Sequence, residues 1–548
     1  KRVELRKMAV ESDVFDYVIV GSGAAGSIVA ARLAEQPDCS ICVLEAGPAD
    51  HHPFIHIPAG FLKTLSNPSL TWTFKTAPNS LTEGRRINLP QGRVVGGSSS
   101  INGMMYNRGQ PADFDSWAQL GNRGWDYDSV LPYFTRTERR VGHGAEGVRG
   151  REGRLPITDM DWFHPVSEAF IAGAVGLGLP RNPDYNSGDQ AGIGYYQRAI
   201  EGGRRISAAR AYLLPAVRAG RVELRVNARA CAIVLKGRKA VGVRYLPARG
   251  AAEREVRARR EVIVCAGAVN TPRLLQLSGI GGGALLNGLG VPVLHELPGV
   301  GENLRDHFSI RAVARARPDV VTLNELAHGR RLVGQILRWC LGRPSILSTV
   351  PSHVYGFWKS DEALTAPDLQ FMFSPGSYKK GRNYVLDDFP GITAGVSQHR
   401  PQSTGWVRAL SRDVFEDPEI QPNYLMAEGD RATILAGFKI ARRLLATPEL
   451  APYLEGEVLP GPGVVRDDEI MAFIRENGAS AFHVAGTAKM GPSGDRMAVV
   501  DDRLRVHGLG GLRVIDASIM PSMPSANTYA STLMIAEKGA EMIRSGLD

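Results

Sequence analysis

The stretch FDYVIVGSGAAGSIVAARLAEQ, residues 15–36, joins three local patterns. FDYVIV is a short apolar run, which indicates a buried strand. GSGAAG follows directly, and SIVAARLAEQ has the alanine-rich composition of a helix. A strand, a GxGxxG turn and a helix in this order are typical of a dinucleotide-binding unit.

Each glycine of this turn has a distinct expected task. Gly21 permits the tight turn, Gly23 lets a pyrophosphate approach the backbone, and Gly26 lets helix and strand pack closely. The phosphates would lie at the helix N-terminus. A second strand, SICVLEAG, ends near Glu45, where a carboxylate can bind ribose hydroxyls and would disfavour a 2′-phosphate. This unit alone leaves NAD and FAD open.

The composition is that of a globular protein with two domains or one large insertion. The chain has 548 residues, 43% hydrophobic and 22% charged, with 65 Lys+Arg against 56 Asp+Glu. The basic residues form short clusters without an aromatic platform, so no nucleic-acid partner is expected. Five cysteines make no disulfide framework, and the CSIC pair, Cys39 and Cys42, is predicted to be core thiols. HHPFIH (51–56) is a proline-broken loop, and no metal site is expected.

No segment of the sequence indicates secretion or a membrane span. The opening KRVELRKMAVESD lacks an apolar signal core, and no apolar run is long enough to cross a bilayer. LVGQILRWCLG (332–342) is flanked by arginines, which fits either an interfacial amphipathic helix or a helix that covers a pocket. We therefore expect a cytoplasmic protein and leave peripheral contact with the inner membrane open.

Two further segments are rich in small residues beside apolar ones. QGRVVGGSSSINGMMYNRG (91–109) suggests backbone that approaches a large flat group or makes a second phosphate contact. EVIVCAGAVNTPRLLQLSGIG (261–281) reads as a buried strand, a glycine turn and a helix.

These segments resemble the two signature patterns of the glucose–methanol–choline (GMC) family of flavin oxidoreductases, through GRVVGGSSSIN and GAVNTPRLLQLSGIG. LPGVGENLRDH (297–307), FHVAGTAKMG (482–491), GLRVIDASIMP (511–521) and NTYASTLMIAEKGAEMI (527–543) also resemble family segments in family order. The resemblance runs from about Val14 to Ile543. It implies an α/β fold, with a Rossmann-like FAD-binding domain assembled from separated segments and an antiparallel-sheet α+β substrate-binding domain.

The resemblance also implies where FAD is bound. The family places a covalent flavin histidine at the position of Ile101 in some members, so the flavin is expected to be non-covalent. The positions that match cofactor-binding residues are Gly21, Ser22, Gly23, Ala24, Ala25, Gly26, Glu45, Ala46, Val95, Gly97, Ser98, Asn102, Gly103, Met104, Ala230, Asp516, Ala517, Asn527 and Thr528.

His483 and Asn527 match the two catalytic positions of the family. A histidine with an ordinary pKa near 6.5 is a competent base, and could take the hydroxyl proton while hydride leaves for the flavin. An asparagine can donate to the developing alkoxide and hold the substrate in place.

The resemblance divides the chain into two predicted domains. Residues 14–154, 204–309 and 461–546 would form the FAD-binding domain, and residues 155–203 and 310–460 the substrate-binding domain. DLQFMFS, GITAGVSQH and TGWVRALS alternate apolar and polar residues, as antiparallel strands do. Phe357, Trp358, Phe371 and Phe373 could line the substrate pocket or belong to the core.

The expected function is FAD-dependent oxidation of an alcohol to a carbonyl compound, with oxygen or a quinone-type acceptor as reoxidant. The chain looks most like the bacterial branch of choline, long-chain alcohol, sorbose and hydroxymethylfurfural enzymes, and HPFIHIPAGF leans toward sugar-alcohol or furanic substrates. The alternatives are a non-redox hydroxynitrile lyase, disfavoured by Asn527, and a flavin-binding electron-relay protein, disfavoured by His483. Oligomeric state is left open.

Overall fold

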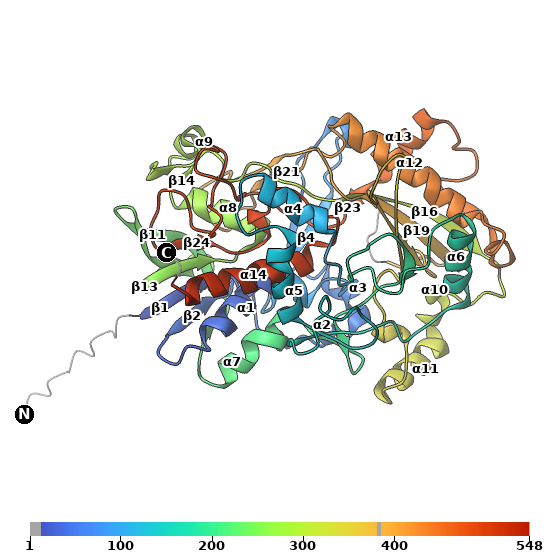
Figure 1. Ribbon diagram of the computed structural model, residues 1–548, viewed down its shortest axis with the longest axis horizontal. Helices are drawn as coiled ribbons and strands as arrows, with labels where there is room; N and C mark the ends of the chain where they lie inside the picture. Colours follow the sequence, from blue (N-terminus) through green and yellow to red (C-terminus); the bar gives the residue numbers. More distant parts are fainter. Residues whose placement is uncertain (1–12, 381–384, 547–548) are drawn as a thin grey trace, which may run out of the picture.

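A computed structural model of the chain describes residues 13–380 and 385–546. The described chain is built around two large sheets, and Figure 1 shows them in two adjoining halves of the molecule. Residues 1–12 of the opening segment KRVELRKMAVESD, in which no secretion signal is expected, lie outside the described residues.

The first sheet has the strand order β10–β2–β1–β13–β12–β11, with β24 beside β13. The strands β10, β2, β1, β13 and β24 are parallel, whereas β12 and β11 continue the sheet antiparallel. Their bounds are β1 (Val14–Val20), β2 (Ile41–Leu44), β10 (Glu223–Arg225), β11 (Arg229–Lys236), β12 (Lys239–Leu246), β13 (Arg254–Val264) and β24 (Leu512–Val514).

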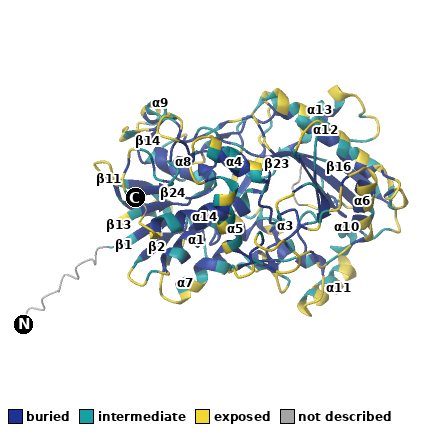
Figure 2. Cartoon of the chain, in the orientation of Figure 1, coloured by how far each residue is buried: buried dark blue, intermediate teal, exposed yellow. Residues whose placement is uncertain are grey.

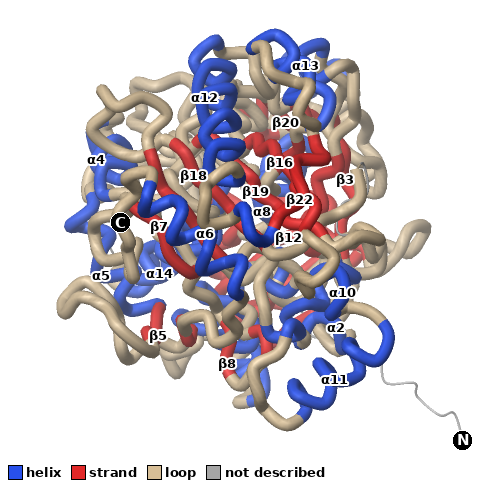
Figure 3. Tube along the Cα trace, turned by 90° about the vertical axis from the view of Figure 1, so that its right-hand side faces the viewer, coloured by secondary structure: helices blue, strands red, loops and turns tan. Residues whose placement is uncertain are grey.

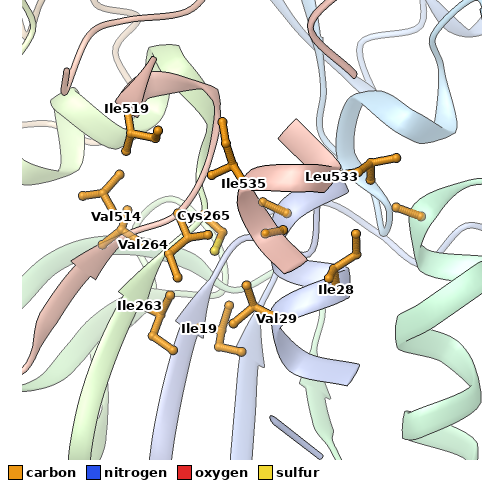
Figure 4. Close-up of a cluster of buried hydrophobic side chains, with 14 of the residues drawn as sticks. Ile19, Ile28, Val29, Ile263, Val264, Cys265, Val514, Ile519, Leu533 and Ile535 are labelled. Atoms are coloured by element: carbon orange, nitrogen blue, oxygen red, sulfur yellow. The ribbon is translucent and has the colours of Figure 1, made fainter. Parts of the chain in front are cut away.

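Helices from both ends of the chain cover this sheet. α1 (Ala24–Leu33) packs against α14 (Thr528–Arg544), and α5 (Tyr127–Thr137) packs against α14 in turn. Figure 4 shows Ile19 of β1, Val29 of α1 and Ile535 of α14 in one apolar cluster. Because β1 and β2 have buried residues in succession rather than in alternation, they read as continuous apolar runs.

The second sheet is antiparallel, with the order β22–β16–β19–β18–β17–β7 and β23 beside β16. α12 (Glu428–Leu445) crosses it, with α6 (Pro165–Gly176) and α13 (Asp467–Asn477) near by (Figure 3). The strand bounds are β7 (Gly192–Tyr195), β16 (Phe308–Ala316), β17 (Val354–Trp358), β18 (Leu369–Ser374), β19 (Gly391–Gln398), β22 (Leu454–Leu459) and β23 (Ala479–Ser480).

Shorter elements border the two sheets. They include α8 (Gly267–Leu277), α11 (Gly329–Cys340), β3 (Thr71–Lys75), β4 (Asn88–Gly92) and the 3-10 helices η1 (Pro58–Gly60), η3 (Gly97–Ser100), η5 (Ile346–Ser348) and η7 (Ala517–Ile519). The other short elements of the described chain are α2 (Pro53–His56), α3 (Phe61–Thr64), α4 (Pro111–Gln119), α7 (Leu214–Arg218), α9 (Gly283–Gly288), α10 (Leu323–Leu326), η2 (Ser80–Thr82), the π-helix η4 (Ala209–Leu213), η6 (Ala451–Tyr453), β5 (Glu138–Arg140), β6 (Leu155–Ile157), β8 (Ile200–Glu201), β9 (Arg204–Arg205), β14 (Ile280–Gly281), β15 (His295–Glu296), β20 (Trp406–Arg408) and β21 (Glu419–Gln421).

The predicted fold class is confirmed, because a mostly parallel sheet with covering helices stands beside a separate antiparallel sheet. The predicted domain boundaries stay a prediction. The first sheet draws its strands only from the predicted FAD-binding segments, whereas β23 joins the second sheet from inside one of them. TGWVRALS contributes β20, which pairs with β21 outside the large sheets.

The cysteines, the HHPFIH segment and the lengths of the helices bear on three expectations from the sequence. All five cysteines are free thiols. Of the pair predicted to be core thiols, Cys42 is buried in the core, whereas Cys39 is half-buried and packs against it. HHPFIH contains the short helix α2 rather than a continuous loop. Over residues 13–380 and 385–546, none of the helices is both long enough and apolar enough to traverse a lipid bilayer.

Candidate active site

The glycines of the first turn differ in what the fold requires of them. A Cβ atom on Gly21 would lie 2.4 Å from the carbonyl oxygen of Cys265, and Gly21 has a φ of +99°. A Cβ atom on Gly26 would lie 1.9 Å from the carbonyl oxygen of Gly21. A Cβ atom on Gly23 would meet nothing nearer than the Cα of Gly97, at 3.8 Å. The fold therefore requires Gly21 and Gly26, whereas the room beside Gly23 is available to a ligand.

Glu45 lies just after β2, at the edge of the sheet where the parallel strands end. Its carboxylate accepts hydrogen bonds from the Ser22 backbone N–H (3.1 Å), the Ser22 hydroxyl (2.6 Å) and the Gly47 N–H (2.8 Å). Burial raises the pKa of the Glu45 carboxyl. These bonds hold the carboxylate beside the glycine turn, where it can accept from the hydroxyls of a ribose.

The glycine–serine turn packs directly on the first turn. Gly97 has a φ of +53°, and a Cβ atom there would lie 2.7 Å from the Cα of Gly23. The side-chain oxygen of Asn102 accepts from the Met104 N–H (3.0 Å) and from the guanidinium of Arg205 (2.8 Å). Arg205 is fully buried, which lowers its pKa to about 9. Sequence reasoning did not single out this arginine, which holds the glycine–serine turn in place through its hydrogen bonds to Asn102 and to the carbonyl of Ser99.

A cavity of about 770 Å³ extends along both turns. This volume is in the upper part of the range of ligand pockets. The predicted residues that line it are Gly21, Gly23, Ala24, Ala25, Glu45, Ala46, Gly97, Ser98, Asn102, Gly103, Met104, Ala230, His483, Asp516, Ala517, Asn527 and Thr528.

Three predicted cofactor residues lie behind this lining. Ser22 donates to Glu45, Gly26 packs on Gly21, and the Val95 side chain is in the hydrophobic core. Their contact with a cofactor stays a prediction. Ile101, at the position of the family's covalent histidine, lines the cavity and is buried.

Asp516 joins three elements at the cavity wall. It precedes η7, and its carboxylate accepts from the Ser518 N–H (2.8 Å). The same carboxylate accepts from the Gly267 N–H (2.9 Å) and the Thr271 hydroxyl (2.6 Å), both in α8. Burial raises its pKa. The end of β24 and the start of α8 are thereby fixed to one another.

The two predicted catalytic side chains meet in the wall of the same cavity. His483 follows β23, and Asn527 immediately precedes α14. The side-chain nitrogen of Asn527, Nδ2, lies 3.0 Å from His483 Nε2. The Asn527 side-chain oxygen makes no capping bond to α14 and accepts from Gln370 instead, while Nδ2 faces the histidine.

His483 is neutral in this environment. Burial, together with the neighbouring imidazole of His307, holds the pKa of His483 well below its ordinary value. A neutral imidazole has one nitrogen lone pair that can take a proton. The site therefore presents a proton acceptor rather than a cation at neutral pH.

The loop that carries His483 is strained and tied down. The preceding residue, Phe482, has a φ of +65°, which is uncommon for a residue other than glycine. The carboxylate of Asp306 accepts from the His483 N–H (2.7 Å) and from the hydroxyls of Tyr424 and Ser480. Burial raises the pKa of Asp306 to about 6. These contacts hold a backbone conformation that costs about 1–3 kcal/mol by itself.

Sequence reasoning missed three side chains behind the catalytic pair. His307 Nδ1 lies 2.9 Å from His483 Nδ1. The Gln370 amide donates to the Asn527 side-chain oxygen (3.3 Å) and to the hydroxyl of Tyr196 (2.6 Å). His307 ends the segment LPGVGENLRDH, and its place directly before a strand was the one available signal.

The roof of the cavity decides between the two roles left open for four aromatic residues, and they belong to the core. Phe371 and Phe373 are buried in the core on the side of α12, Trp358 packs against that core, and Phe357 belongs to the other main cluster. None of these four aromatic residues is among the cavity lining. Met372 and Ser374, which alternate with the phenylalanines on β18, line it instead. The pleat of the strand puts adjacent residues on opposite faces, so the lining face is the more polar one.

The glycine turn and Glu45 form a nucleotide cradle, and the same cavity continues to the neutral imidazole of His483. This is the arrangement of a flavin-dependent oxidoreductase. The residues fit FAD, because the space beside Gly23 and the Glu45 carboxylate suit a pyrophosphate and a ribose. The chain belongs to the GMC oxidoreductase family, whose sequence profile matches residues 15–309 and 401–536.

Known proteins resemble the chain over almost its whole length. It is 37% identical to the alcohol dehydrogenase [acceptor] of Pseudomonas putida, over 97% of this chain and 96% of the other. It is 38% identical to the mitochondrial choline dehydrogenase of Homo sapiens, over 97% and 90%. The crystal structure of pyridoxine 4-oxidase from Mesorbium loti superposes with a TM-score of 0.87 at 31% identity, covering 97% of this chain and 99% of that one.

Proposed function

We propose that His483 is the base that removes the hydroxyl proton of an alcohol, and that Asn527 holds that hydroxyl. The chain is an FAD-dependent oxidoreductase that acts on CH–OH donors. The observation that carries the assignment of residues is the 3.0 Å contact between His483 Nε2 and Asn527 Nδ2 in the cavity wall.

The two side chains have complementary tasks. His483 Nε2 accepts the proton as the hydroxyl becomes an alkoxide. Asn527 Nδ2, which donates to that nitrogen here, can donate to the alkoxide oxygen when an alcohol enters. When bound, FAD would supply the hydride acceptor, and oxygen or a quinone-type compound would be the reoxidant. Ile101, at the position of the family's covalent histidine, offers no nucleophile and would leave the flavin non-covalent.

The proposed substrates are polar alcohols without a positive charge. The sheet above the cavity contributes Ser309, Ser374 and Thr393, which can hydrogen-bond to hydroxyl groups. Over the described residues of the lining, the carboxylates are Glu45 and Asp516 at the nucleotide cradle, and Glu476, which is 3.1 Å from the ammonium of Lys380. Among these described lining residues, no carboxylate is placed to balance a quaternary ammonium beside His483. We expect a kcat/KM at least about tenfold higher for sugar alcohols or furanic alcohols than for choline.

Anaerobic mixing of the enzyme with an alcohol tests the role of His483. The flavin colour of the unmodified enzyme should bleach, whereas a lyase or an electron-relay protein would keep it. His483→Ala should bleach about 10²–10⁴-fold more slowly while retaining FAD. Bleaching of His483→Ala at the unmodified rate would remove this histidine from the chemistry.

A second proposal concerns α11, which we infer to dock on an anionic membrane surface. None of its residues is buried, and Figure 2 shows it mostly exposed at the periphery. Val333, Leu337 and, just beyond the helix, Leu341 are 55%, 59% and 70% exposed. The helix has no acidic residue, and the exposed arginines around this apolar face are Arg330, Arg331, Arg338 and Arg343. An apolar stripe flanked by arginines is the pattern of an interfacial helix.

The position of α11 connects this surface to the cavity. Trp339 donates from its indole to the carbonyl of Gly203 (2.8 Å), so the helix is attached through its inner side. α11 packs on η5, and η5 packs on η1. Phe61, directly after η1, and Pro351, shortly after η5, line the cavity. A membrane at α11 would therefore lie beside one wall of the active site.

Vesicle sedimentation tests this docking. The protein should sediment with anionic phosphatidylserine vesicles more than with neutral phosphatidylcholine vesicles, and Leu337→Asp should abolish the difference. Leu410→Asp is the matched control, because Leu410 is equally exposed, at 59%, outside α11. If the protein shows no preference for anionic vesicles, the proposal is overturned. It is also overturned if the unmodified protein is a dimer in solution and Leu337→Asp makes it a monomer, because α11 would then bind a second copy of the chain rather than a membrane.

A further inference from the structure

His307 is the side chain that makes contact with the far side of the catalytic imidazole. It lies immediately before β16 and is 1% exposed. Its Nε2 is 2.7 Å from the backbone carbonyl oxygen of His399, and its Nδ1 is 2.9 Å from Nδ1 of His483. The two rings cross at 86°. His307 therefore joins a fixed backbone acceptor to the proposed base.

The carbonyl determines where the protons lie in this chain of contacts. A carbonyl oxygen can only accept, so His307 Nε2 carries a hydrogen. Burial lowers the pKa of His307 to about 4, although the backbone carbonyls of His399 and Pro524 both act to raise it, so the ring is neutral. With its one hydrogen on Nε2, toward the His399 carbonyl at 2.7 Å, the ring has a lone pair on Nδ1. The 2.9 Å contact is a hydrogen bond only if His483 Nδ1 is the donor.

The same order of donors extends to the other side of His483. A neutral His483 with its hydrogen on Nδ1 has its lone pair on Nε2. Asn527 donates to this atom through Nδ2, and the Asn527 oxygen accepts from Gln370. Every contact from the His399 carbonyl to Gln370 then has one donor and one acceptor.

We propose that His307 is a positioning residue that fixes His483 as its Nδ1–H tautomer and so directs the basic Nε2 lone pair toward the alcohol. This inference rests on the proposed role of His483 as the base. His307 itself is separated from the alcohol by the His483 ring. The orienting neighbour of a catalytic histidine has this effect in other enzymes, where the wrong tautomer abolishes most activity.

Rapid anaerobic mixing of two His307 variants with an alcohol tests the proposal. His307→Leu keeps the volume but removes the acceptor, and the flavin should be reduced about 10- to 100-fold more slowly, because the buried Nδ1–H loses its partner. His307→Asn places an oxygen near the position of Nδ1 and should restore the rate to within about fivefold of the unmodified enzyme. The KM for the alcohol and the FAD content should change little in either variant.

Two controls distinguish loss of the acceptor from loss of packing and from failure of His483 as the base. His353→Leu removes another fully buried histidine, whose ring makes no hydrogen bond over the described residues, and should leave the reduction rate unchanged. His483→Ala should be slow in the same assay; a fast His483→Ala variant would overturn the proposed function itself. If His483→Ala is slow but His307→Leu is fast, the role of His307 alone is refuted. Equal slowing by His307→Leu and His307→Asn, or loss of FAD from both, would also refute it, because packing rather than the acceptor would then matter.

Discussion

Gly23→Ala should separate the cofactor's requirement for glycine from that of the fold. Gly23 has an ordinary φ of −66°, and an added Cβ atom would have only a normal contact at 3.8 Å. An alanine preceding the helix costs some tenths to about 1 kcal/mol relative to glycine. The lower backbone entropy of the unfolded alanine variant returns about 0.4–1 kcal/mol. The free energy of unfolding of the apoprotein should therefore change by less than about 1 kcal/mol.

The loss should appear in FAD affinity instead. The new methyl group would stand where the pyrophosphate must approach the backbone and would displace one or two charge-assisted hydrogen bonds. Each such bond contributes about 1.5–3 kcal/mol, so the loss of one or two of them should raise the Kd for FAD about 10- to 10⁴-fold. Titration of the apoprotein with FAD, followed by flavin fluorescence, measures this change.

The neighbouring glycine supplies a contrast. In Gly26→Ala the Cβ atom would lie 1.9 Å from a backbone oxygen, so this variant should unfold at a lower temperature even without FAD. The separate roles of the two glycines are refuted if Gly23→Ala binds FAD as tightly as the unmodified protein. They are also refuted if Gly23→Ala lowers the melting temperature of the apoprotein as much as Gly26→Ala does.

Three further predictions concern protonation and packing. Burial lowers the pKa of His353 to about 3, so the stability that comes from this neutral ring is fully present above pH 6.5 and is lost as the pH falls from 6.5 toward 3. Between pH 6.5 and pH 5 the loss is about 2 kcal/mol. The melting temperature of His353→Leu should therefore fall less steeply over this pH range than that of the unmodified protein. Asn527→Asp places a carboxylate about 3.0 Å from His483 Nε2, which should raise the pKa of the imidazole, and stopped-flow reduction should be at least about 10²-fold slower at neutral pH. Phe371→Ala should cost about 3–5 kcal/mol in denaturant unfolding, whereas Met372→Ala should change kcat/KM for the alcohol more than stability; the reverse result would contradict the assignment of strand faces.

The nucleotide cradle was predictable because its signals are local. The strand, the glycines and the helix of residues 14–33 are adjacent in the chain, and the structure has them as β1, the turn and α1. The resemblance to known family segments placed His483 and Asn527, which no local pattern could have brought together.

The features that sequence reasoning missed depend on contacts between distant residues. His307 and His483 are 176 positions apart, and nothing in either segment states that the rings touch. Which face of β18 lines the cavity depends on a shift of a single residue. Phe371 and Met372 are adjacent in the strand, yet the side chain of Phe371 is in the core and that of Met372 lines the cavity. Amphipathic character marked α11 correctly, but only the fold shows that its apolar side points outward.

The pairing of α1 with α14 has a consequence for biosynthesis. Arg32 on α1 bonds to Glu537 on α14 through two hydrogen bonds, across 505 positions of the chain. At about 5–20 residues per second, a ribosome needs roughly 25–100 s to deliver the second partner after the first. The nascent nucleotide-binding half must wait through that interval with its apolar helix face uncovered, so chaperone supply during translation should limit the yield of active enzyme.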